Sequence, residues 1–157
     1  EIKDFKLNAV AVQAAFETGG MEAVASLALK KDDDVKGSNG DDWLKGFAGE
    51  DTLNGQKGSD YLLGGLGDDL LIGGKGADYF VFEADGSVDL VKDFKVDGNN
   101  HDVIAVDADL LGTAAWERDG KNLVVTFEDQ GSIELKGVRP GEFNEDFIVA
   151  LPEDNLV

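Results

Sequence analysis

The sequence predicts a mainly β protein, a solenoid in which short parallel strands stack coil upon coil. Three observations predict this fold. Residues 37–81 divide into five consecutive nine-residue units with nothing left over. Every unit has Gly at positions one and four, Asp at position six and a large apolar residue at position eight. Glycine recurs where a tight turn needs positive φ or close backbone approach, and the apolar residue recurs where a strand points inward.

Two units make one full coil of such a solenoid, so units 18 residues apart stack in the same sheet. Neighbouring strands lie about 4.8 Å apart, which also fixes the spacing of the stacked aspartates. A weaker unit at residues 28–36 keeps Asp at position six and Val at position eight. The position-six aspartates are therefore expected to form two columns: Asp33, Asp51 and Asp69 along one edge, and Asp42, Asp60 and Asp78 along the other.

Unpaired, these columns repel, because two carboxylates about 5 Å apart at an effective dielectric constant of about 20 cost about 3 kcal/mol. Calcium prefers oxygen ligands at about 2.3 to 2.6 Å, and a carboxylate on each side of the ion then spans about one step of the stack. Magnesium fits poorly because its bonds are shorter and its octahedron strict. We predict Ca²⁺ between successive aspartates, giving the four pairs 33/51, 51/69, 42/60 and 60/78, with one or two further sites at the ends.

The remaining ligands are expected to be backbone carbonyls of the glycine-rich turns. We assign them to the position-four glycines, which are Gly40, Gly49, Gly58, Gly67 and Gly76. The units resemble the calcium-binding nonapeptides of RTX (repeats-in-toxin) proteins, and five units in frame make the resemblance specific. Position two departs from that pattern, being Ser38, Phe47 and Gln56 in the first three units.

The resemblance implies a right-handed parallel β-roll and a bacterial protein secreted by a type I exporter. It also implies that position five sometimes adds a ligand, which here points to Asp41 and Asp68. Three parts are expected: a helical cap at residues 1–31, the calcium-binding roll at 32–81, and a β cap at 82–157 that includes a type I secretion signal.

Composition supports an extracellular, metal-stapled domain. The 157 residues carry 33 acidic and 14 basic side chains, and the net charge of −19 argues against nucleic acid or an anionic membrane as partner. Cysteine is absent, so metal is expected to replace disulfides as the staple. No apolar run approaches the roughly 20 residues that span a bilayer. The N-terminus lacks the order of a signal peptide, which predicts export by another route or an excised fragment.

Ahead of the roll, residues 5–29 carry apolar side chains on good helix formers, interrupted near Gly19 and Gly20. Two helices covering the open end of the solenoid are expected, because terminal caps shield exposed core and strand edges. A membrane-active or partner-binding amphipathic helix is the alternative.

Inside the roll, position eight supplies one inward side chain per strand: Leu44, Leu53, Leu62, Leu71 and Phe80. This core is too thin to offset the ordering of so many glycines, so the roll is predicted to be disordered without calcium. Position seven faces outward and places Trp43, Tyr61 and Tyr79 in an aromatic ladder. The ladder either stacks on a polysaccharide or lies beneath a flanking element.

After Val81 the nine-residue frame fails. Short strands are expected at residues 82–83, 88–91 and 103–106, and Asp89 or Asp85 falls near the next step of the column after Asp69. Strands near 115–118, 123–127 and 132–135 predict an antiparallel meander. The tail at 143–150 fits either a type I secretion signal or a last strand that pairs with the meander.

The chain is interpreted as non-catalytic. His101 is the only histidine, and the sequence suggests neither a nucleophile nor a second metal ligand beside it. The leading hypothesis is a calcium-binding module that folds after type I secretion and promotes folding of its parent protein, with a monomer favoured. The alternatives are a carbohydrate-binding module of a polysaccharide-acting enzyme, or an adhesin or surface-layer segment.

Overall fold

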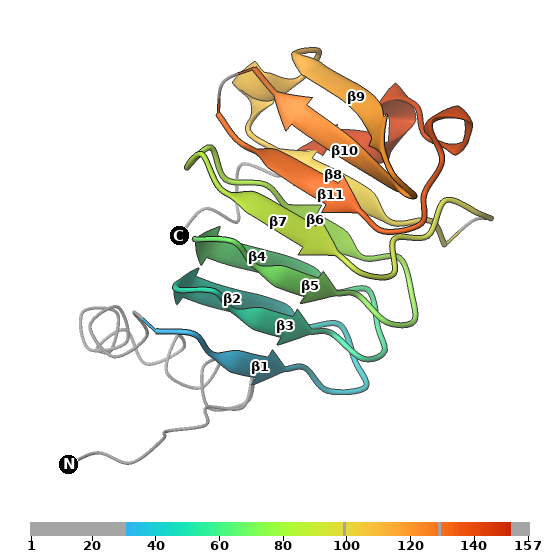
Figure 1. Cartoon of the computed structure of the whole chain (residues 1–157). Helices are drawn as coiled ribbons and strands as arrows, with labels where there is room; N and C mark the ends of the chain where they lie inside the picture. Colours follow the sequence, from blue (N-terminus) through green and yellow to red (C-terminus); the bar gives the residue numbers. More distant parts are fainter. Residues whose placement is uncertain (1–30, 99, 129, 152–157) are drawn as a thin grey trace.

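The computed structural model describes residues 31–98, 100–128 and 130–151. Short strands stack in two facing sheets, with the chain passing from one sheet to the other at each turn (Figure 1). The helices predicted within residues 5–29 lie outside the described residues. In the part of the chain that the structure describes, no helix is long and apolar enough to cross a membrane.

Odd-numbered and even-numbered strands of the repeat region separate into the two sheets. The seven-stranded sheet has the order β1-β3-β5-β7-β11-β10-β9, and the five-stranded sheet has the order β12-β8-β6-β4-β2. The repeat strands are β1 (Asp34–Lys36), β2 (Trp43–Ala48), β3 (Thr52–Asn54), β4 (Tyr61–Leu66), β5 (Leu70–Ile72) and β6 (Tyr79–Val81). The alternation confirms that one coil consists of two nine-residue units.

The pairing register follows the repeat. β2 pairs with β4 in parallel with Trp43 opposite Tyr61, and β3 pairs with β5 in parallel with Thr52 opposite Leu70. Each pair is offset by 18 residues, so the same position of successive coils stacks directly. Since a slip of one residue would turn every inward side chain outward, the alternation of polar and apolar residues pins this register. The fold is a parallel β-roll.

Each strand of the roll contributes one inward side chain to the core, as the sequence predicts. Leu44, Leu53, Leu62, Leu71 and Phe80 are each at most 1% exposed. Outward from them, Trp43, Tyr61 and Tyr79 stack in a ladder with ring centroids 4.7 and 4.3 Å apart. All three rings are half-buried.

The coil continues past the last repeat. β7 (Val88–Val91) extends the seven-stranded sheet in parallel with β5, and β8 (Val103–Val106) extends the five-stranded sheet in parallel with β6. The strand expected at residues 82–83 is wrong, because the chain leaves the sheet after Val81 and Phe82 turns into the core instead.

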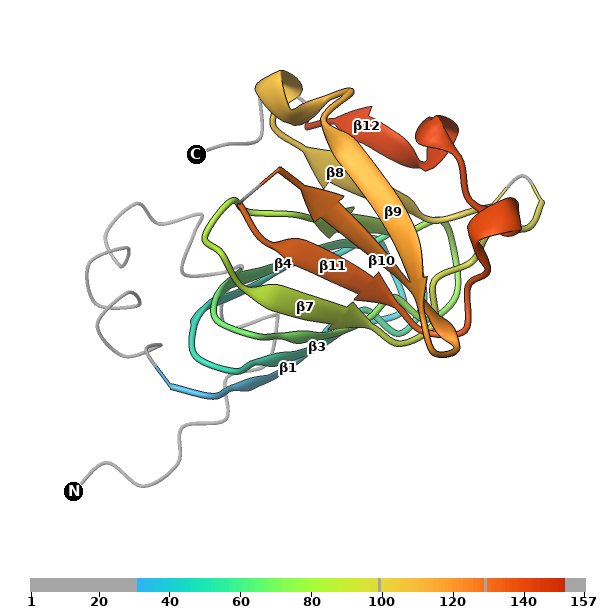
Figure 2. The same cartoon turned by 45° about the horizontal axis from the view of Figure 1, so that its top comes forward.

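The C-terminal strands extend both sheets at one end of the molecule: β11, β10 and β9 extend the seven-stranded sheet, and β12 extends the five-stranded sheet (Figure 2). The predicted meander is confirmed, with β10 (Asn122–Phe127) antiparallel to both β9 (Ala114–Asp119) and β11 (Ser132–Leu135), and β11 joins β7 in parallel. Three short 3-10 helices follow β8 and β11: η1 (Ala108–Leu110), η2 (Pro140–Glu142) and η3 (Glu145–Phe147).

The last strand corrects a second expectation. β12 (Ile148–Ala150) pairs in parallel with β8 of the five-stranded sheet, and not with the meander. The reason is that η2 and η3 carry the chain from the end of one sheet across to the other, while Phe143 and Phe147 are buried on the way.

Candidate metal centre

Two columns of aspartates run along the roll where the strands begin. The first column is Asp33, Asp51, Asp69 and Asp89, and the second is Asp42, Asp60, Asp78 and Asp102. In each column the backbone N–H of one aspartate donates to Oδ1 of the aspartate one coil further on. The N···O distances are 2.7, 2.7 and 3.1 Å in the first column and 2.8, 3.1 and 3.0 Å in the second.

The structure therefore brings together the predicted carboxylates and adds one to each column. Asp89 follows Asp69 after 20 residues, which resolves the choice between Asp89 and Asp85 in favour of Asp89. Asp85 instead accepts a hydrogen bond from the Gly67 N–H. Asp102 follows Asp78 after 24 residues and was not predicted as a site residue. The signal for it is an Asp directly before the apolar strand β8, hidden by the longer intervening loop.

The second carboxylate oxygen is the unusual feature of these columns. Oδ2 of Asp33, Asp51, Asp60 and Asp69 is buried and has no hydrogen-bond partner among the residues that the structure describes. Three of these residues, Asp51, Asp60 and Asp69, are at most 2% exposed. An unpaired buried carboxylate is expensive, because removal from water is not compensated by any contact. These oxygens therefore call for a cation between the coils.

Glycine at position one makes room for the carboxylate of its own unit. A Cβ placed on Gly37 would lie 2.8 Å from Asp42 Oδ2, and a Cβ on Gly46, Gly55, Gly64 or Gly73 would collide with Oδ2 of the corresponding aspartate. Any side chain here would displace the carboxylate from its column. Glycine at position one is therefore required by the carboxylate site as well as by the turn.

Glycine at position four lets neighbouring coils approach. Gly58 has φ 120° and its Cβ would lie 2.5 Å from the Gly40 carbonyl oxygen one coil away. Gly67 and Gly76 stand in the same relation to the carbonyls of Gly49 and Gly58. The position-four carbonyls therefore face the gap toward the next coil, as expected for additional oxygen ligands. The predicted role of Gly40, Gly49, Gly58, Gly67 and Gly76 as ligands stays a prediction.

Position two keeps its backbone shape at two of the three units where glycine is missing. Phe47 and Gln56 have φ values of 82° and 76°, close to the 107° and 96° of Gly65 and Gly74. Residues with side chains adopt this region at a penalty of about 1–3 kcal/mol, and only where surrounding structure holds them. At Phe47 and Gln56 the departure from the repeat pattern therefore leaves the course of the turn unchanged, whereas Ser38 does not adopt a positive φ.

Burial also perturbs the acidity of the columns. Desolvation, with repulsion from neighbouring carboxylates added, raises the pKa of Asp60 and Asp69 to about 6 and that of Asp89 to about 7. Desolvation raises the pKa of Asp33 and Asp51 as well. A carboxyl group whose pKa is raised in the absence of metal is stabilised strongly by a divalent cation, because the cation favours the charged form.

The position-five acids lie at the solvent side. Asp41 Oδ1 accepts from the Ser59 N–H at 2.7 Å and Asp68 Oδ1 accepts from the Val88 N–H at 2.9 Å. One oxygen of each carboxylate thus links two coils directly. The other oxygen could bind an ion, and the role of Asp41 and Asp68 as extra ligands stays a prediction.

No three His, Asp or Glu side chains gather into one compact metal cluster within residues 31–98, 100–128 and 130–151. Each gap instead offers two carboxylates from successive coils, so an ion there would complete its shell with backbone carbonyls or water. Calcium tolerates this donor set, because it takes six to eight oxygen ligands in flexible geometry. The residues present fit calcium.

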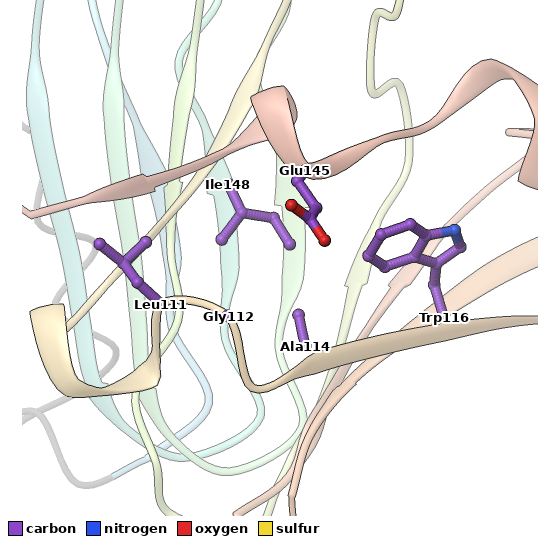
Figure 3. A pocket seen from close by; sticks show the side chains of 6 residues that line it. All are labelled: Leu111, Gly112, Ala114, Trp116, Glu145 and Ile148. Atoms are coloured by element: carbon purple, nitrogen blue, oxygen red, sulfur yellow. The ribbon is translucent and has the colours of Figure 1, made fainter.

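Other surfaces offer less chemistry. The Nδ1–H of His101 donates a hydrogen bond to the Gly98 carbonyl oxygen, and the ring packs edge-on against Phe147. The groove in Figure 3, about 200 Å³ in volume, is lined by Leu111, Gly112, Ala114, Trp116, Glu145 and Ile148. Glu145 is the only ionisable side chain among these six.

The parallel β-roll and its paired acidic columns define a calcium-binding solenoid. The family model of the RTX calcium-binding nonapeptide repeat matches residues 31–62 and 55–86. Residues 31–86 are therefore RTX calcium-binding repeats. No curated protein sequence matches the chain at a significant level.

Two solved structures share the fold. The AlgE6R3 subunit of the mannuronan C5-epimerase from Azotobacter vinelandii is 26% identical with a TM-score of 0.59, and the match covers 82% of this chain and 83% of that one. The extracellular lipase LipA from Serratia marcescens is also 26% identical, with a TM-score of 0.58. The match covers 76% of this chain but 20% of the lipase, so the roll forms a small part of that enzyme.

Proposed function

We propose that calcium ions occupy the gaps between successive aspartates and convert this chain from an open polymer into a folded roll. The observation that carries the proposal is the set of four buried, partnerless Oδ2 atoms on Asp33, Asp51, Asp60 and Asp69. A protein of net charge −19 that buries such carboxylates gains stability from divalent cations, which neutralise the unpaired buried charge.

The pairs that would hold an ion follow from the columns. In the first column they are Asp33 with Asp51, Asp51 with Asp69, and Asp69 with Asp89. In the second they are Asp42 with Asp60, and Asp60 with Asp78. The position-four carbonyl on the earlier coil would contribute to each site. Bound calcium supplies charge neutralisation and a cross-link between coils, and the carboxylates supply the specificity for a hard, oxygen-seeking ion.

The same linkage supports a role in secretion. Where calcium is scarce the acidic turns repel and the chain stays extended, a form suited to passage through a type I exporter. Extracellular modules bind calcium at about 10⁻⁴–10⁻³ M, so folding would begin outside the cell. The extracellular lipase among the similar structures is consistent with this location. The module itself is non-catalytic and promotes folding of the parent protein to which it belongs.

Circular dichroism during a calcium titration tests the proposal. The chain in chelator is expected to lose the β signal of its repeat strands, and calcium is expected to restore it, whereas equal magnesium is not. Asp60→Asn should raise the calcium concentration at the midpoint, because Asp60 borders two gaps. Asp119→Asn, an exposed acid at the end of β9, is the matched control and should leave the midpoint unchanged. Equal β content in chelator and calcium would refute the proposal.

The aromatic ladder supports a second candidate function, carbohydrate binding. Trp43, Tyr61 and Tyr79 stack on the outer face of the five-stranded sheet and remain half-buried. One structural relative is a subunit of a mannuronan epimerase. Binding of acidic polysaccharide that is lost in Trp43→Ala, with calcium-dependent folding intact, would favour this function. No binding by the folded wild-type chain would exclude it.

A further inference from the structure

The second aspartate column ends in a different way from the rest of the site. Asp78 is fully buried, yet its Oδ2 is not among the partnerless oxygens. Lys95, in the loop after β7, brings its Nζ to 3.3 Å from Asp78 Oδ2 and 3.4 Å from Asp102 Oδ1. The same ammonium donates to the Gly76 carbonyl oxygen at 3.1 Å. Its three contacts are therefore all oxygens.

These three oxygens are the equivalents, one coil further on, of those at the preceding gap. Gly76 and Asp78 occupy positions four and six of their unit, as Gly58 and Asp60 do in theirs. Asp102 accepts from the Asp78 N–H just as Asp78 accepts from the Asp60 N–H. In the earlier gap Asp60 Oδ2 has no partner, whereas in the later gap Asp78 Oδ2 has the ammonium. The ammonium thus lies where the repeat would place a cation.

The loop holds Lys95 in this place by backbone contacts. Its N–H donates to Asp102 Oδ2 at 2.9 Å, and its carbonyl accepts from the Asp102 N–H at 2.9 Å. Two residues earlier, Asp93 accepts from the N–H groups of Gly73 and Gly74 at 3.0 and 2.9 Å. The backbone is therefore held at Asp93 and at Lys95, and the Lys95 side chain is 34% exposed above two aspartates of zero side-chain exposure.

We propose that Lys95 is a built-in cation that fills the last gap of the second column, so that no calcium ion lies between Asp78 and Asp102. The inference rests on the proposed calcium sites, because it assigns one gap to the protein's own side chain and leaves the others to metal. Lysine suits the position as a compact point charge with three donors on a flexible stem. On the first column, the gap between Asp69 and Asp89 keeps a partnerless Oδ2 on Asp69 and stays available to metal.

The consequence is a last coil that is held by metal on one edge only. On the second edge the Lys95 ammonium takes the place of calcium. It therefore joins β6 and β8 before any ion binds. Removal of the ammonium should turn the gap into an additional calcium site, since two buried carboxylates and a carbonyl remain.

The test counts calcium ions in the wild-type chain and in Lys95→Ala by equilibrium dialysis at saturating calcium. The variant is expected to bind one ion more than the wild type. Lys92→Ala, which removes an exposed lysine from the same loop, should bind the same number as the wild type. An unchanged count in Lys95→Ala would overturn the assignment.

A crystal of the wild-type chain grown in calcium tests the inference without relying on a variant. Anomalous difference density is expected in the gaps of the first column and in the two earlier gaps of the second, but not between Asp78 and Asp102. A calcium peak between Asp78 and Asp102, alongside peaks in the other gaps, would overturn the role of Lys95 and leave the proposed function standing. An absence of calcium from every gap would overturn both.

Discussion

The repeat region and the C-terminal strands solve the same problem of stability by different means. In the repeats, each strand buries one side chain at position eight, and the turns bury carboxylates without partners. In the C-terminal part, β10 buries Leu123, Val125 and Phe127 at 0% exposure. Aromatic rings also pack there across several elements, with Phe82 against Phe127 at 4.4 Å between centroids.

The difference shows where the chain depends on an external ligand. In a core of large side chains, the burial of apolar surface offsets the conformational entropy that is lost on folding. Each Å² of apolar surface contributes about 25 cal/mol. A coil of glycines, aspartates and one leucine per strand buries little apolar surface, and under the proposed function bound calcium supplies the stability that is missing. The boundary between the two regimes lies near Asp78 and Asp102, where a lysine takes over from metal.

Calcium removal should separate the two regions most strongly. In chelator, amide hydrogens of β1 to β5 are expected to exchange at rates near those of an unfolded chain. The reason is that the aspartates of each column repel one another when no calcium lies between them. Amides of β10, flanked on both sides by β9 and β11, should retain protection. Hydrogen exchange with mass spectrometry after proteolysis measures both in one sample. Equal loss of protection in the two regions would show that they form a single cooperative unit.

Removal of one carboxylate should depend on how many gaps it borders. At a free calcium concentration one hundred times the dissociation constant, each occupied site adds about 2.7 kcal/mol to the free energy of unfolding. Asp69→Asn disturbs two gaps and should lower this free energy by about 5 kcal/mol, whereas Asp33→Asn disturbs one and should lower it by about half as much. Urea denaturation in calcium gives both values. Equal losses would mean that the ions do not lie between successive aspartates.

Core truncations sharpen the comparison further. Phe127→Ala is expected to lower the free energy of unfolding by about 3–5 kcal/mol through lost burial and a residual cavity. Its effect should appear in chelator as well as in calcium, as lost protection of β10. Leu62→Ala should lower stability by about 2–5 kcal/mol in calcium only, because under the proposed function the roll that contains it is unfolded without metal. An effect of Leu62→Ala on exchange in chelator would contradict this division.

Much of the repeat region could be predicted from its sequence, because the repeat constrains every level of structure at once. Position six fixed the columns from Asp33 to Asp78, and position eight fixed the inward row from Leu44 to Phe80. Local pattern and global register agree there, so few alternatives compete. The stacking of the aromatic ladder followed from the same register.

Beyond Val81 the prediction weakened for a physical reason. The intervals to Asp89 and Asp102 are 20 and 24 residues, so strict counting by 18 fails to find Asp102. The contact of Lys95 with Asp78 and Asp102 of the second column depends on how a loop folds back, and a single lysine carries no periodic signal. The parallel pairing of β12 with β8 likewise depends on a non-local crossover.

Single glycines give the smallest and most local comparison of the two regions. Gly74 has φ 96° and a Cβ there would collide with the Gln56 carbonyl oxygen, which belongs to backbone and cannot move aside. Gly120 has φ 59° in the turn between β9 and β10, and a Cβ there meets nothing within 4 Å. Gly74→Ala should therefore lower the free energy of unfolding by more than the roughly 1–2 kcal/mol of left-handed strain that Gly120→Ala introduces.

Thermal unfolding in saturating calcium compares these two variants, and Gly141→Ala serves as a control because that glycine has neither a positive φ nor a close neighbour. If Gly74→Ala were no worse than Gly120→Ala, the coils would be able to move apart without loss. The close approach of backbone between coils would then not be what sets the spacing of the carboxylates, and the metal gaps would owe their size to the ions alone.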